Sequence, residues 1–272
     1  MNSFHVHLVS DSTGETVILV ARASLVQFEQ IEPQEHHWTM IRSPNQVEGV
    51  LKGIADNPGF VIFTLVNTEN RKILEEGCRR LQLPCVPVLD PVVAGLGTYL
   101  GAEIHARPGG QHVLDDEYFN RIEAMQFALS HDDGQSTWDI NDADVVLMGV
   151  SRTSKTPTSI YLANRGIKTA NIPLVPGCPI PEEIFEAKNP LIIGLTKDPK
   201  RLVEIRRQRL RMINQDENTD YVDLEMVSKE INDARRLYTK HDWAVINVSR
   251  KSIEETAATI IKMYHEHQET SL

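Results

Sequence analysis

Cysteine, positive charge and long apolar runs are all scarce in this chain. The chain has only three cysteines, at positions Cys78, Cys85 and Cys178. Their odd number and the lack of C-x-x-C spacing argue against a disulfide scaffold or a zinc site. The net charge of −10 disfavours nucleic acid and anionic membranes as partners. No apolar run approaches the length of a membrane span, and no signal peptide precedes the first expected strand. We therefore expect a cytoplasmic protein of the reducing cytosol.

Apolar strand-like runs alternate with helical patterns along the 272 residues, which implies parallel βαβ units. The expected fold class is α/β, with an N-terminal parallel α/β domain followed by a C-terminal P-loop kinase-like α/β domain. Residues 135–142 are polar and turn-prone, so we place the boundary there, giving domains 1–140 and 141–272.

A phosphate-binding loop is the strongest local signal. Val145 to Met148 form an apolar strand, and a helix with Ile160 to Ala163 in its first turns follows the loop. The loop between them matches G-x-x-x-x-G-K-[ST] except at its sixth position, and it comprises Gly149, Val150, Ser151, Arg152, Thr153, Ser154, Lys155 and Thr156. Lys155 would reach the outer phosphates of a nucleotide, and the Thr156 hydroxyl would ligate Mg²⁺.

Ser154 replaces the second glycine of that pattern, which leaves a second interpretation open. An ordinary strand-to-helix turn could use Ser154 or Thr156 as its N-cap. A serine also costs more than glycine if the position requires a positive φ.

A second polar loop follows the expected strand Phe4 to Val9 and precedes a helix over 17–28. Hydroxyls and backbone N–H groups at a helix N-terminus favour an anion or substrate site that includes Asp11, Ser12 and Thr13. Simple helix capping by Ser12 or Thr13 is the equally weighted alternative.

The rest of the N-terminal half predicts further βαβ elements. We expect strands near 39–42, 60–66 and 85–89, and helices over 46–55 and 69–81. Residues 91–110 are rich in glycine and predict a surface loop or lid. The expected helix 118–129 ends at His131, Asp132 and Asp133, which form either a C-terminal turn or a general base with a magnesium-binding partner.

Basic residues concentrate on one helix of the C-terminal half, after a predicted buried strand over 191–196. Asp198 follows that strand as a candidate magnesium ligand or as the start of the helix. Arg201 and Arg209 fall roughly on one helix face, where they either clamp phosphoryl oxygens or remain solvated. Further strands are expected over 169–175 and 243–248, and further helices over 181–188, 222–238 and 252–265, the last with a Ser252–Glu255 capping box.

Five motifs in this order resemble the bacterial pyruvate, phosphate dikinase regulatory proteins, over nearly the whole chain. They are LVSDSTGETV at 9–18, HDDG at 131–134, GVSRTSKTPTS at 149–159, GLTKDPKRLVEIRRQRL at 194–210 and VSRKSIEETAATI at 248–260. The resemblance implies a bifunctional enzyme that uses ADP to phosphorylate a threonine of pyruvate, phosphate dikinase. It also implies a reverse activity with inorganic phosphate that releases pyrophosphate. The serine before the lysine is typical of this family.

Roles can be assigned by joining this resemblance to the residue chemistry. Lys155 and Arg152 would neutralise charge during transfer, with Mg²⁺ assisting. The base would be Asp132, Asp133 or His131, with Asp11 next. Three alternatives stay open: the same chemistry on phosphoenolpyruvate synthase, a small-metabolite P-loop kinase, and a nucleotide sensor. The sequence also leaves open whether the chain forms a homodimer.

Overall fold

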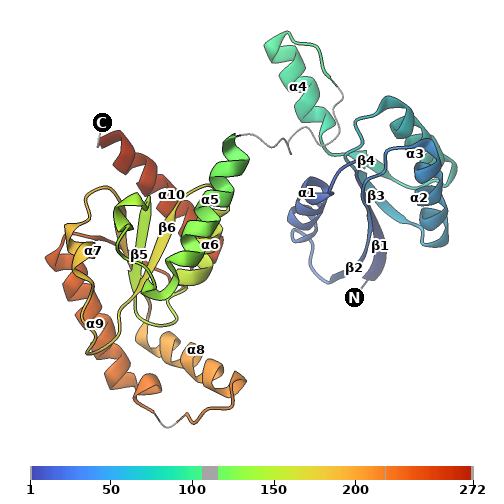
Figure 1. The fold of residues 1–272 in the computed structure, drawn as a ribbon. Coiled ribbons are helices and arrows are strands. Elements are labelled where there is room, and N and C mark those ends of the chain that lie inside the picture. Colours follow the sequence, from blue (N-terminus) through green and yellow to red (C-terminus); the bar gives the residue numbers. More distant parts are fainter. Residues whose placement is uncertain (1, 106–115, 218, 271–272) are drawn as a thin grey trace. The chain divides into compact units, whose positions relative to one another are not determined.

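A computed structural model describes residues 2–105, 116–217 and 219–270, and its contacts divide the chain after Val113 into two compact units (Figure 1). Unit 1 is Met1–Val113 and unit 2 is Leu114–Leu272. This division falls earlier than the expected boundary at 140. The reason is that helix α5 (Asp116–Ser130) packs on a helix and a strand of unit 2. No helix within the described ranges is both long and apolar enough to cross a membrane.

Unit 1 is a four-stranded parallel sheet in the order β2-β1-β3-β4 (Figure 1). Its strands are β1 (Asn2–Val9), β2 (Ile31–Trp38), β3 (Gly59–Phe63) and β4 (Cys85–Pro87). Its helices are α1 (Glu15–Leu25), α2 (Pro44–Asp56), α3 (Thr68–Arg80) and α4 (Asp90–Leu100). Val17 and Ala21 of α1 pack on one face of the sheet, and apolar residues of α2 and α3 pack on the other.

Two sequence expectations for unit 1 are wrong. The second strand is Ile31–Trp38 rather than 39–42, because an edge strand tolerates proline and polar residues that obscure its pattern. Residues 90–100 form α4 instead of a loop: Pro91 stands in its first turn, and Gly101 ends it with a φ of 60°. Residues 106–110 of the expected lid lie outside the described residues.

Unit 2 repeats the same strand order as β6-β5-β7-β8, again all parallel. Its strands are β5 (Val145–Gly149), β6 (Thr169–Pro173), β7 (Leu191–Thr196) and β8 (Ala244–Asn247). Besides α5, its helices are α6 (Lys155–Ala163), α7 (Glu182–Glu186), α8 (Pro199–Met212), α9 (Leu224–Lys240) and α10 (Ile253–Thr270). Short 3₁₀ turns are η1 (Asp132–Gly134), η2 (Ile140–Asp142) and η3 (Asp220–Val222).

Two apolar layers enclose the sheet of unit 2. Residues of α8 and α9 pack on one face, and residues of α6 and α10 pack on the other. The capping box of α10 is confirmed, since Ser252 N donates to Glu255 Oε2 at 2.8 Å and Glu255 N donates to Ser252 Oγ at 3.1 Å. In both units the strand order reverses between the first and third strands, and ligands of open α/β sheets bind at the carboxyl ends of strands beside such a reversal.

Candidate active site

The loop from Gly149 to Thr156 leaves the carboxyl end of β5, at the reversal of strand order in unit 2. A Cβ on Gly149 would lie 2.6 Å from Thr153 Oγ1 and 3.0 Å from the Leu195 carbonyl oxygen, so only glycine fits there. Thr153 Oγ1 in turn donates to the Val150 carbonyl at 2.8 Å and closes the loop. The sequence therefore forms a compact loop directly before the N-terminus of α6.

Ser154 adopts the left-handed conformation, with φ 67° and ψ 24°. The position does require a positive φ, as glycine in the general pattern suggests, and a serine occupies it here. Arg152 also has a positive φ, of 71°. Ser154 is the N-cap residue of α6 but makes no side-chain capping bond, which removes the capping explanation for this serine.

Lys155 is buried at the base of the loop, where its Nζ donates to the Val150 carbonyl at 3.3 Å. Burial lowers the pKa of Lys155 to about 8, although Asp133 and Asp132 oppose this shift. An anion bound to the loop would supply the negative charge that the buried ammonium group lacks.

Asp132 of η1 lies beside the loop. The Thr156 hydroxyl donates to Asp132 Oδ1 at 2.9 Å, and the amide of Asn171 on β6 donates to the same oxygen. Asn171 is fully buried and its Nδ2 also contacts Thr156 Oγ1 at 2.9 Å. Asp132 and Thr156, which the sequence predicted for the site, therefore lie together. Asn171, which the sequence did not indicate, contacts both of them.

His131 is buried, and both of its ring nitrogens face acceptors. Nε2 lies 2.7 Å from Asp139 Oδ1, and Nδ1 lies 2.8 Å from the Phe127 carbonyl oxygen. The ring also stacks on Phe127 with a centroid distance of 3.8 Å. His131 thus fixes the turn that presents Asp132, whereas Asp133 is exposed and has a φ of 50°.

The end of β7 contributes a second lysine. Lys197 is buried and its Nζ donates to the Arg152 carbonyl at 3.3 Å. Burial lowers its pKa, and Arg201 lowers it further. Asp198 is the N-cap of α8 and accepts from Arg201 N at 3.1 Å, as the helix-start interpretation expects.

Arg206 is the buried member of the basic helix, with 1% of its surface exposed. Its Nη2 donates to Glu230 Oε2 at 2.7 Å and to the Ser151 carbonyl at 3.3 Å. The Arg206 guanidinium therefore links the loop to Glu230 of α9. Arg201 and Arg209 are exposed on α8.

The polar loop of unit 1 lies at the equivalent reversal of strand order. Asp11 is buried, and its Oδ2 accepts from Val66 N at 2.8 Å across the ends of β1 and β3. Ser12 is half-buried and Thr13 is exposed. The N-cap of α1 is Gly14, with a φ of 87°, so neither Ser12 nor Thr13 occupies the capping position.

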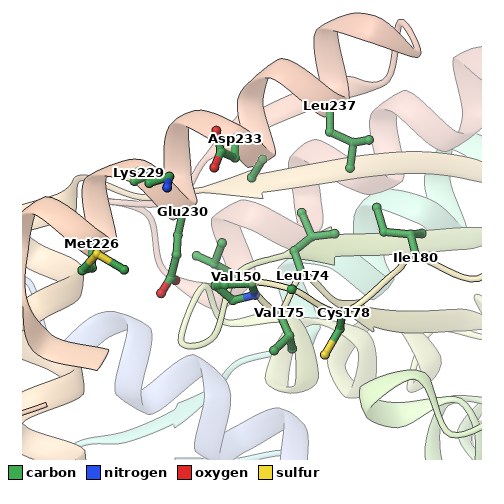
Figure 2. Close-up of a pocket in the computed structure, with 13 residues that line it drawn as sticks. Val150, Leu174, Val175, Cys178, Ile180, Met226, Lys229, Glu230, Asp233 and Leu237 are labelled. Carbon is green, nitrogen blue, oxygen red and sulfur yellow. The ribbon is translucent and has the colours of Figure 1, made fainter. Parts of the chain in front are cut away.

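A pocket of about 350 Å³ opens beside the phosphate loop (Figure 2). Its walls are Val150, the segment Leu174–Ile180 after β6, and one side of α9. Figure 2 shows Leu174, Val175 and Cys178 on the side of this space opposite α9.

Oxygen ligands suitable for Mg²⁺ also lie at the loop. Among the described residues, no three His, Cys, Asp or Glu side chains form a metal-ligating group. However, Mg²⁺ commonly takes only one or two protein ligands and completes its shell with phosphate and water. The adjacent oxygens of Thr156 and Asp132 fit that requirement.

A loop of this kind, at the carboxyl end of a central parallel strand, is typical of α/β phosphotransferases. The chain belongs to the kinase/pyrophosphorylase family, whose model matches residues 6–261. It is therefore an enzyme of phosphoryl transfer.

Close relatives cover nearly the full length and are described as pyruvate, phosphate dikinase regulatory proteins. The chain is 58% identical to one from Paramagnetospirillum magneticum over 269 residues, which is 99% of this chain and 86% of the relative. It is 52% identical to one from Erythrobacter litoralis, over 98% and 96% of the two chains. A third, from Caulobacter vibrioides, is 52% identical over 96% and 82%. These findings confirm the resemblance seen in the five motifs.

Proposed function

We propose that this enzyme regulates pyruvate, phosphate dikinase by reversible phosphorylation of a threonine. In the forward direction the threonine oxygen attacks the β-phosphorus of ADP, the bond to the bridging oxygen breaks, and AMP leaves. In the reverse direction inorganic phosphate attacks the phosphothreonine, which releases pyrophosphate and restores the hydroxyl. The full-length similarity to relatives described as regulators of this dikinase carries the proposal.

The phosphate loop would hold the donor. Backbone N–H groups at the start of α6 and the ammonium group of Lys155 would face the phosphoryl oxygens, with the Arg152 guanidinium above them. Thr156 and Asp132 would hold Mg²⁺, which neutralises phosphate charge when bound, and Asp198 is a second candidate ligand because it follows β7. Arg201 and Arg209 would add positive charge from α8.

Because Asp132 would be held by Mg²⁺, Asp133 of the Asp132–Asp133 pair is the favoured base for the threonine proton. Both belong to the turn beside Thr156, whereas the two nitrogens of His131 face Phe127 and Asp139. Asp11, Ser12 and Thr13 stay candidates for a second anion or substrate site in unit 1, since they follow the first strand of that sheet.

Transfer of label tests this function. ADP labelled at its β-phosphate and ATP labelled at its γ-phosphate are each incubated with purified dikinase and, separately, with phosphoenolpyruvate synthase. We expect label on a dikinase threonine from ADP. Label on the synthase, on a small metabolite, or on neither protein with nucleotide still bound would each overturn the dikinase assignment.

Variants test the residue roles in the same assay. Lys155→Ala is expected to lower both activities at least 100-fold, because an oriented charge on the transferred group is lost. Lys262→Ala, at an exposed lysine on α10, serves as the matched control. Wild-type activity in Lys155→Ala would contradict the loop assignment. Full activity in both Asp132→Asn and Asp133→Asn would require another base.

A further inference from the structure

The pocket beside the phosphate loop, here called the β6 pocket, has apolar walls and a charged rim. Its apolar lining includes Val150, Leu174, Val175, Ile180, Met226 and Leu237. Val175 and Met226 are 50% and 41% exposed, so apolar side chains face solvent at its mouth. Lys229, Glu230 and Asp233 of α9 supply the charges (Figure 2).

Charge is distributed unevenly on the two sides of the phosphate loop. On the β7–β8 side, a hollow of about 600 Å³ is lined by four basic side chains and two acidic ones: Lys200, Arg201, Arg250, Lys251, Asp198 and Glu204. On the β6 side, Lys229 and Asp233 balance each other, and the Glu230 carboxylate is already paired with Arg206. A nucleoside diphosphate is a polyanion and is attracted to the β7–β8 side.

In-line transfer places the attacking and leaving oxygens on opposite sides of the phosphoryl group. Because β5 lies between β6 and β7, a donor over β7–β8 leaves the β6 side to the acceptor. The carboxylate of Asp132 is also on that side, since Asn171 of β6 donates to it. The pocket walled by the segment after β6 therefore lies next to the path of the attacking hydroxyl.

We propose that the β6 pocket binds an apolar side chain close to the target threonine in the protein substrate. The proposal rests on the function proposed above and deepens it by assigning the acceptor side of the site. The volume is at the small end of the range for ligand pockets, which suits one or two side chains.

Filling the pocket tests this assignment. Cys178 is an exposed lining residue, so Cys178→Trp adds a large ring at the wall of the pocket. Val245→Trp, at an exposed position on β8, is the matched control. We expect Cys178→Trp to raise the KM for dikinase about 10-fold or more while the Kd for ADP changes less than twofold. Val245→Trp should change neither.

A second variant keeps the proposal testable if the first variant misfolds. Met226→Ala removes one apolar wall from an exposed position and should also raise the KM for dikinase, with an unchanged thermal midpoint. A raised Kd for ADP in either variant would assign the pocket to the nucleotide instead. An unchanged KM for dikinase in both variants would overturn the inference alone. If the wild-type enzyme transfers no label to dikinase, the proposed function fails and the inference fails with it.

Discussion

Asn171 Nδ2 lies 2.9 Å from Thr156 Oγ1, and the same nitrogen donates to Asp132 Oδ1. One buried amide on β6 therefore orients both the hydroxyl at the start of α6 and the carboxylate on η1. Asn171 acts through these neighbours and is a positioning residue.

Asn171→Ala is expected to lower kcat about 10- to 100-fold, because supporting residues of this kind typically contribute that much. The KM for ADP should change less than threefold, since the loop itself stays intact. Thr169→Val is a matched control on the same strand: Thr169 is equally buried, and its hydroxyl donates to the Ile167 carbonyl. Steady-state transfer assays distinguish the two, and equal kcat values would contradict the positioning role.

The sequence predicted the phosphate loop because glycine, lysine and a hydroxyl recur there at fixed spacing. It did not predict the role of Asn171, because an asparagine inside an apolar strand carries no spacing signal and its partners come from distant segments. The turn at Asp132 was recognised as a candidate, but only the fold brings it to Thr156. Helix α4 was missed because two internal glycines obscured a helix that has Pro91 in its first turn and ends at Gly101.

Ser154 offers a test of the loop conformation. A non-glycine residue in the left-handed region costs about 1 kcal/mol or more, and a β-branched residue costs more still. Ser154→Gly should therefore keep stability or raise it by up to about 1 kcal/mol, whereas Ser154→Val should lower it by about 1–2 kcal/mol. Urea unfolding measures both, and the same sign for the two variants would argue against the positive φ.

Arg206 and Glu230 form a buried ion pair that braces the loop. Glu230→Gln leaves the guanidinium without its counter-charge and is expected to cost about 3–5 kcal/mol of unfolding free energy. The double variant Arg206→Met with Glu230→Gln should recover part of that loss. A double-mutant cycle by chemical denaturation measures the coupling, and additive single effects would exclude it.

The buried His7 side chain is expected to make the folded state of unit 1 less stable in acid. Burial lowers the pKa of His7, and nearby His36 and His5 lower it further. The neutral ring accepts from Trp38 Nε1 at 3.1 Å and faces the Asn57 carbonyl oxygen at 2.8 Å. Below about pH 6.5 the unfolded chain binds a proton that the folded chain does not, so stability is full above this pH and declines below it.

His7→Gln should therefore flatten the loss of stability between about pH 6.5 and 5, where one such group contributes up to about 1.4 kcal/mol per pH unit. Urea midpoints at several pH values measure this slope. His265→Gln, an exposed histidine on α10, should leave it unchanged. A His7 variant with the wild-type slope would show that another group controls the acid response.

The position of Asp132 bears on how the enzyme can be dissected. This carboxylate reaches Thr156 from a turn that precedes β5, and α5 carries that turn. A fragment beginning at residue 141 would retain the entire phosphate loop and its sheet. It would lack Asp132, whose carboxylate accepts a hydrogen bond from the Thr156 hydroxyl. ADP binding by such a truncated protein would therefore not show that its catalytic site is complete.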